Sequence, residues 1–117
     1  MSGGDVLRHD RVGWAVRESE ERTAEGLAMI RGIRGEWELY ERVMREHARR
    51  LESAGEGEDP KNYFVLRRGD ARREREGCVE RLVREQVDVL DAAEREMSSC
   101  GEDEQDRLRR EGTSLWD

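Results

Sequence analysis

Few residues of this chain could do chemistry, and their spacing keeps them apart. The 117-residue sequence has two histidines, His9 and His47, and two cysteines, Cys78 and Cys100. On one helix the two histidines would lie about ten turns apart, so they cannot share a metal ion. The two cysteines would lie roughly 33 Å apart, too far for a disulfide bond. We therefore expect no metal site, and free thiols of the kind found in reducing compartments.

Enzyme motifs are also missing from the sequence. It contains no HExxH, CxxC, P-loop or GxSxG pattern. Carboxylate–arginine pairs such as Glu38–Arg42 and Glu41–Arg45 are typical of exposed helix faces, where each is worth about 0.3–0.5 kcal/mol. A catalytic carboxylate pair needs a buried pocket, and a chain with 44% charged and 5% aromatic residues has little material for one. We expect no catalytic residue and no cofactor, and a protein that holds another protein.

Charge and hydropathy narrow the class of partner. The formal net charge is −7, whereas nucleic-acid binding requires a basic face. No apolar run has the length of a membrane span, and the N-terminus lacks the apolar core of a signal peptide. We expect a soluble, cytoplasmic protein whose partner is neither a nucleic acid nor a membrane.

The elements that must carry these residues are helices, and the clearest helical repeat lies in the first half of the chain. Apolar residues recur there every seven positions, and a second set follows the first by three: Ile30, Trp37, Met44 and Leu51, then Ile33, Tyr40, His47 and Ala54. This spacing predicts the a and d seam of a coiled coil, with Arg and Glu on the solvated face. The first helix should cover residues 6–54 and end near Gly55.

Two turns divide the rest of the chain. A flexible turn at Gly55–Glu58 is followed by Asp59, a good helix cap, and by Pro60, which suits the first helical position. A second helix should therefore cover residues 60–98 and return antiparallel to the first. Ser98–Gly101 predicts another turn, followed by a short third helix over residues 102–112.

The expected fold is thus all-α, a single domain of residues 1–117. It is an elongated, coiled-coil-like antiparallel bundle of two long helices and a shorter third. The centre of the second helix, Arg67–Gly77, is nearly all charged and contains two glycines. We expect that stretch to be exposed or only loosely packed.

The tryptophans near the two ends of the chain have two interpretations. Trp14 falls on the outer face of the first helix, and exposed tryptophans are favoured at interfaces. Packing of Trp14 on the third helix or on a chain end accounts for it equally well. Trp116 raises the same question.

Several patterns occur in the order seen in the tubulin-folding cofactor A family. A stretch within Ile30–Tyr40 resembles helix 1 of that family, where an aliphatic–basic pair, a second aliphatic residue, a Glu and a Tyr match Ile30, Arg31, Ile33, Glu36 and Tyr40. An acidic, glycine-containing turn follows, then Asp59-Pro60, and Phe64–Arg68 resembles the opening of helix 2. The resemblance covers Thr23–Met97 and leaves residues 1–22 as an N-terminal extension. The sequence departs from the family at Gly69, Arg72 and Arg73.

The resemblance implies a cytoplasmic, cytoskeleton-associated chaperone that works without ATP. Such a protein binds β-tubulin after its release from the cytosolic chaperonin and passes it on toward heterodimer assembly. It would meet other tubulin-folding cofactors only indirectly, as a monomer or a homodimer. The candidate partner-binding residues are Tyr40, Phe64, Leu66, Arg67, Arg68, Arg72 and Arg73. A solvated face is the alternative for the arginines, and a place in the bundle core is the favoured interpretation for Tyr40 and Phe64.

Two other functions fit the heptads and the charge. One is a structural coiled-coil subunit of a larger assembly. The other is an unrelated helical adaptor that dimerises through the Ile30–Leu51 seam.

Overall fold

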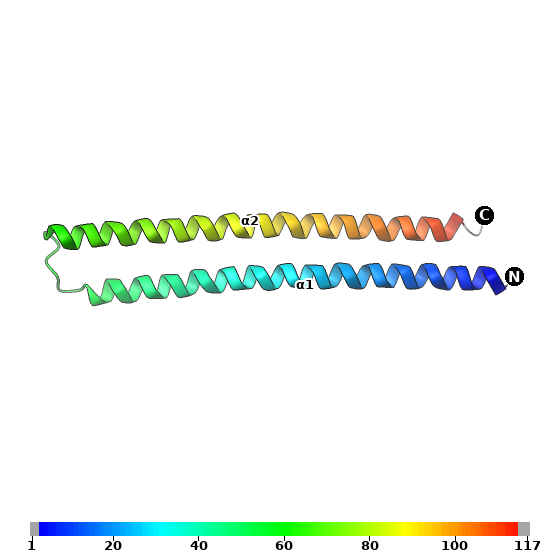
Figure 1. The fold of residues 1–117 in the computed structure, drawn as a ribbon, viewed down its shortest axis with the longest axis horizontal. Helices are drawn as coiled ribbons and strands as arrows, with labels where there is room; N and C mark the ends of the chain where they lie inside the picture. Colours follow the sequence, from blue (N-terminus) through cyan, green and yellow to red (C-terminus); the bar gives the residue numbers. More distant parts are fainter. Residues whose placement is uncertain (1–2, 115–117) are drawn as a thin grey trace. The chain divides into compact units, whose positions relative to one another are not determined.

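Two long helices account for nearly all of the chain. The computed structural model describes residues 3–114, with side chains from residue 7 to residue 113. Helix α1 (Gly3–Ala54) and helix α2 (Tyr63–Ser114) are joined by a loop of residues 55–62 (Figure 1). Residues 3–114 contain no strand. The all-α prediction is confirmed, and α1 ends next to Gly55 as its sequence indicates.

The expected third helix is not found among the described residues. Helix α2 runs without a break through Ser98–Gly101, so the predicted turn there is wrong and residues 102–112 belong to α2. The reason is the position of Gly101, which is buried against α1. A Cβ atom on Gly101 would lie 2.5 Å from Thr23 Oγ1. This glycine allows two helices to approach closely, and it does not end a helix.

The N-terminus of α2 is capped by a residue other than the one predicted. Asn62 Oδ1 accepts hydrogen bonds from the backbone N–H groups of Phe64 (2.9 Å) and Val65 (3.4 Å), so Asn62 is the N-cap. Asp59 instead accepts from Lys61 N through its side-chain Oδ1 (2.9 Å) and from Asn62 N through its carbonyl oxygen (3.1 Å). The two bonds close a turn around Pro60, and α2 therefore begins at Tyr63 rather than at Pro60.

An earlier turn carries the chain out of α1. The N–H of Gly55 donates to the carbonyl oxygen of Leu51 at 3.2 Å, which finishes the helix, and Glu58 N donates to Gly55 O at 3.2 Å. Gly57 has a φ of 94°, a left-handed conformation that side chains with a Cβ rarely adopt. Hydrogen bonds between neighbouring residues and the conformation of Gly57 thus set the path of the loop.

The chain divides into two compact units, each containing part of both helices. Unit 1 comprises Met1–Arg31 and Asp91–Asp117, and unit 2 is the continuous segment Gly32–Leu90, which includes the loop. Each unit has its own contact between α1 and α2.

Unit 1 is held together by a close approach of its two helical segments. Val16, Ser19 and Ile30 are buried there. A Cβ atom on Gly112 would lie 2.6 Å from Val12 Cγ1, so glycine is required at a second level of this contact as well. Exposed ion pairs flank the contact: Arg22–Glu104 (2.8 Å), Arg31–Glu94 (3.2 Å) and Arg109–Glu20 (3.3 Å). Pairs of this kind contribute about 0–1 kcal/mol each, so close packing is the main source of stability in unit 1.

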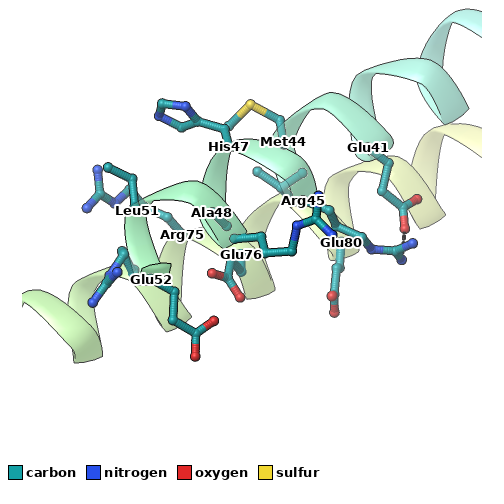
Figure 2. Close-up of a pocket in the computed structure, with 13 residues that line it drawn as sticks. Glu41, Met44, Arg45, His47, Ala48, Leu51, Glu52, Arg75, Glu76 and Glu80 are labelled. Atoms are coloured by element: carbon teal, nitrogen blue, oxygen red, sulfur yellow. Dashed lines mark hydrogen bonds and ion pairs between the residues drawn. The ribbon is translucent and has the colours of Figure 1, made fainter. Parts of the chain in front are cut away.

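Unit 2 is packed less tightly. Among its described residues, Val83 is the one fully buried apolar side chain, with 2% of its surface exposed. A gap of about 300 Å³ lies beside Ala48 and Val79, and Arg72, Arg75 and Glu76 line it (Figure 2). The expected loose packing of the charged stretch is confirmed, because long charged side chains keep their heads in water and leave the space between the helices unfilled.

The heptad seam of α1 is only half used by α2 within unit 2. Trp37, Met44 and Ala48 are half-buried, whereas the members of the second apolar set, Ile33, Tyr40, His47 and Ala54, are exposed. Of the predicted a positions in unit 2, Trp37 and Met44 therefore pack toward α2 and Leu51 stays exposed, and the predicted d positions do not pack there. A repeat of apolar residues marks one side of a helix, and a single neighbouring helix covers only one edge of it.

Candidate partner-binding surface

The side chains of the described residues offer no catalytic constellation. No group of three or more His, Cys, Asp and Glu side chains within residues 7–113 is placed to hold a metal ion. Cys78 and Cys100 are exposed and free. Between residues 3 and 114, neither helix has the length and apolar character that crossing a membrane requires. The surfaces that remain are those that could contact another macromolecule.

Exposed aromatic side chains gather where α2 begins. Tyr63 and Phe64 expose 63% and 72% of their surfaces, and their rings meet edge to face with centroids 5.6 Å apart. The guanidinium of Arg67 lies over the ring of Tyr63, 5.7 Å from its centroid. Leu66 is also exposed. We call this cluster, together with Arg68, the tip patch, because it adjoins the loop of unit 2.

Two sets of contacts hold the tip patch in place. The Asn62 cap fixes the backbone of Phe64 and Val65. Arg68 Nη2 pairs with Glu58 Oε2 of the loop at 3.1 Å, so one of its donor groups is engaged within the chain. Arg67 is held over Tyr63 and keeps its remaining N–H donors in solvent. The patch therefore offers a fixed apolar surface beside a positive charge.

The bundle-core interpretation of the two aromatic candidates is wrong in this structure. Phe64 belongs to the exposed tip patch, and Tyr40 is also exposed, with its ring edge to face against Trp37 at 5.9 Å. Tyr40 is a predicted d position of the heptad seam, and α2 leaves it exposed. Without a third helix among the described residues, both rings meet solvent.

The structure does not bring all seven candidate residues together. Tyr40 lies between Glu38 and Glu41, which share a groove with Val83 of α2. Val83 follows Phe64 by nineteen residues, which is about 28 Å along the helix. Tyr40 is therefore remote from the tip patch.

Arg72 and Arg73 differ in their relation to the tip patch. Arg72 lines a second gap together with Arg68 and Val65, whereas Arg73 pairs with Asp70 on its own helix. Phe64, Leu66, Arg67 and Arg68 are the candidates that lie within the first two turns of α2.

Tyr63 is a member of the tip patch that the sequence analysis missed. Its position in the sequence could have indicated this exposed site, because Tyr63 directly follows Asn62 and directly precedes Phe64. Side chains in the first turn of a capped helix have no preceding turn to pack on, so two consecutive aromatics there are exposed unless another element covers them.

Trp14 has an exposed side chain, with 62% of its surface accessible. The interpretation in which it packs on a third helix or a chain end is therefore not what the structure shows. Trp116 lies outside the described residues, and so do the chain ends beyond residues 3 and 114.

Comparisons with known proteins identify no relative. No family model matches the chain, and neither a curated protein nor a solved structure is similar to it.

Proposed function

We propose that the protein binds another protein through the tip patch, and that its client is β-tubulin released from the cytosolic chaperonin. The observation that carries the binding role is the exposure of Tyr63 and Phe64 on a capped, ordered helix start. Aromatic side chains with an arginine beside them are the groups that most often dominate binding energies at protein interfaces.

The identity of the client is supported by the sequence resemblance. Phe64–Arg68 is the segment that resembles the opening of helix 2 in the tubulin-folding cofactor A family, and it supplies most of the tip patch. The chain has a net charge of −7, and β-tubulin is acidic too, so attraction must be local. Arg67, with free donors beside an aromatic pair, provides such a local contact for carboxylates.

The chemistry of the patch fits capture followed by transfer. Its apolar part consists of three side chains, Tyr63, Phe64 and Leu66, which is a small surface. A small contact releases its client quickly, because affinity differences between related complexes lie mostly in the dissociation rate. A cofactor that passes β-tubulin on toward heterodimer assembly in the cytoplasm needs that release.

A pull-down with freshly released β-tubulin tests the proposal, with α-tubulin in a parallel reaction. The wild-type chain at micromolar concentration is expected to retain β-tubulin and not α-tubulin. The double variant Tyr63→Ala, Phe64→Ala should weaken retention about tenfold or more, because each truncation removes an interface aromatic. Far-UV circular dichroism verifies that the variant keeps its helices.

Trp14→Ala is the matched control. It removes an aromatic of similar exposure from unit 1 and should leave retention unchanged. Absence of any β-tubulin complex with the wild type would refute the client. Retention that survives the double variant but is lost with Trp14→Ala would refute the tip patch as the binding surface.

A further inference from the structure

Helix α1 carries more apolar surface in unit 2 than α2 covers. Ile33, Tyr40 and Val43 remain exposed on α1, and Leu82 and Val89 are exposed on α2. An apolar face this broad is typical of helices that have two neighbours, as in a four-helix bundle. None of these five residues belongs to the tip patch.

The exposed residues of the two helices lie on the same side of unit 2. Successive residues of a helix are rotated by about 100°. Tyr40 and Val43 therefore lie about 80–140° around α1 from the part that faces α2. Leu82 and Val89 lie about 100–120° around α2 from the part that faces α1, and toward the same side of the unit. The opposite side of the unit is polar. A groove there is lined by Glu38, Glu41, Arg45, Glu80 and Arg84 together with valines of α2.

The close-up shows the same division between the two sides. Glu52, Glu76 and Glu80 point to one side of unit 2, and His47, which follows Val43 by one helical turn, points to the other (Figure 2). Unit 2 thus has a charged side and a side that carries exposed apolar residues. On this second side Arg42, Glu46 and Arg50 line a groove with Val43. We call Ile33, Tyr40, Val43, Leu82 and Val89 the apolar face.

The centre of the apolar face is formed by both helices at one level. Glu41 and Val83 line one groove. Because the helices are antiparallel, Val43, two residues further along α1, is level with Leu82. The five side chains expose 38–63% of their surfaces, which amounts to roughly 400 Å² at about 150–200 Å² for each fully exposed side chain. That is about half of the 800 Å² that each partner buries in a standard interface. The apolar fraction of the buried area in such interfaces is also a little over half.

The charges along α1 identify the molecule that fits this face. Glu36 lies seven residues before Val43, and Arg50 lies seven residues after it, so both recur on the exposed side of the same helix. Glu36 forms no ion pair with another described residue. A second α1 laid antiparallel across the first, with the two-fold axis at Val43, places each Glu36 opposite the other copy's Arg50. Arg50 makes one contact within its own chain, to Glu46 at 3.3 Å, and has donors left for a second carboxylate.

We infer that unit 2 binds a second copy of this chain through its apolar face, forming an antiparallel, two-fold symmetric four-helix bundle. The contact is isologous, because the same residues serve both copies, with Val43 and Leu82 nearest the axis. Burial of the apolar face supplies the stability, and the two Glu36–Arg50 contacts set the antiparallel register. The dimer leaves the tip patch of each copy at the surface, available for a client.

Sedimentation equilibrium and light scattering on the full chain test this inference. We expect a dimer at micromolar concentration. Val43→Glu should weaken dimerisation at least tenfold, because it places two carboxylates at the axis. Glu36→Arg should also weaken it, and the double variant Glu36→Arg, Arg50→Glu should restore it, because the double change exchanges the signs of a self-complementary pair.

Glu38→Arg is the control, since Glu38 lines the charged groove on the opposite side of unit 2. It should leave the dimer unchanged, and so should Phe64→Ala. A chain that stays monomeric throughout the micromolar range would overturn the inference. So would a dimer that Glu38→Arg disrupts and Val43→Glu does not, or a double charge variant no better than Glu36→Arg alone. These outcomes are independent of β-tubulin retention, which reports on the tip patch.

Discussion

Gly101 on α2 and Thr23 on α1 are in such close contact that a Cβ atom at position 101 would lie 2.5 Å from Thr23 Oγ1 and 2.8 Å from Thr23 Cγ2. Thr23 is short and branched at Cβ, so its side chain cannot swing away, and any larger residue at position 101 must push the helices of unit 1 apart. The close contact between Gly101 and Thr23 therefore depends on the absence of one methyl group.

Gly101→Ala should destabilise the protein despite the better helix propensity of alanine. Overpacking costs about 1–3 kcal/mol, and the gain in propensity is at most about 1 kcal/mol, so we expect a net loss of about 1 kcal/mol. Urea unfolding followed by circular dichroism measures it.

Gly32→Ala provides the comparison of opposite sign. A Cβ atom there would meet nothing within 4 Å, so this substitution should stabilise the protein by about 0.5–1 kcal/mol. Equal effects of the two substitutions would argue against a close helix contact at Gly101.

Ser19→Ala should stabilise unit 1. Ser19 exposes 1% of its surface, and its Oγ has no hydrogen-bond partner among the described residues. Removing a buried hydroxyl that makes no bond recovers its desolvation cost, and alanine is the better helix former, so a gain of about 1 kcal/mol is expected in urea unfolding. Ser53→Ala, at an exposed position of α1, should change stability by no more than about 0.5 kcal/mol. A loss of stability in the Ser19 variant would contradict an unbonded hydroxyl.

Asn62→Ala should fray the start of α2 and cost about 1 kcal/mol, because the N–H groups of Phe64 and Val65 lose their acceptor. Faster amide hydrogen exchange at these two residues would show the local effect. Asn62→Asp keeps an oxygen in place and should preserve most of the protection. If Asp59→Ala proved more damaging to α2 than Asn62→Ala, the assignment of Asn62 as the cap would be wrong.

Glu46 should titrate below the ordinary carboxyl pKa of 4.5. The hydrogen bond from Arg49 lowers the pKa of Glu46 most, and Arg50 also lowers it. A carboxyl whose pKa is depressed in the folded state stabilises that state above the ordinary pKa, and the contribution disappears as the pH falls through the lower value. This side chain is exposed, so the effect on stability is small and salt weakens it. Carbon-detected NMR titration gives the midpoint directly, and Arg49→Gln should move it up toward 4.5. A midpoint indifferent to Arg49 would rule out that cause.

The sequence by itself determined the all-α class, the end of α1 and the position of the turn that follows it, because these depend on neighbouring residues. The glycines at positions 55 and 57 end α1 wherever the rest of the chain lies, and a run of good helix formers with no proline after Pro60 permits one long α2. The interactions involved join residues that are close in sequence, so the sequence alone is enough to predict them.

The role of Gly101 and the exposure of Tyr40 and Phe64 were decided by tertiary structure alone. Glycine ends a helix in one setting and admits a neighbouring helix in another, and only the proximity of Thr23 distinguishes the two at position 101. The heptad pattern shows that Tyr40 lies on an apolar side of α1, but that side is wider than one helix can cover. Which edge of it meets α2 and which meets solvent depends on packing between segments far apart in sequence, and no local pattern contains that information.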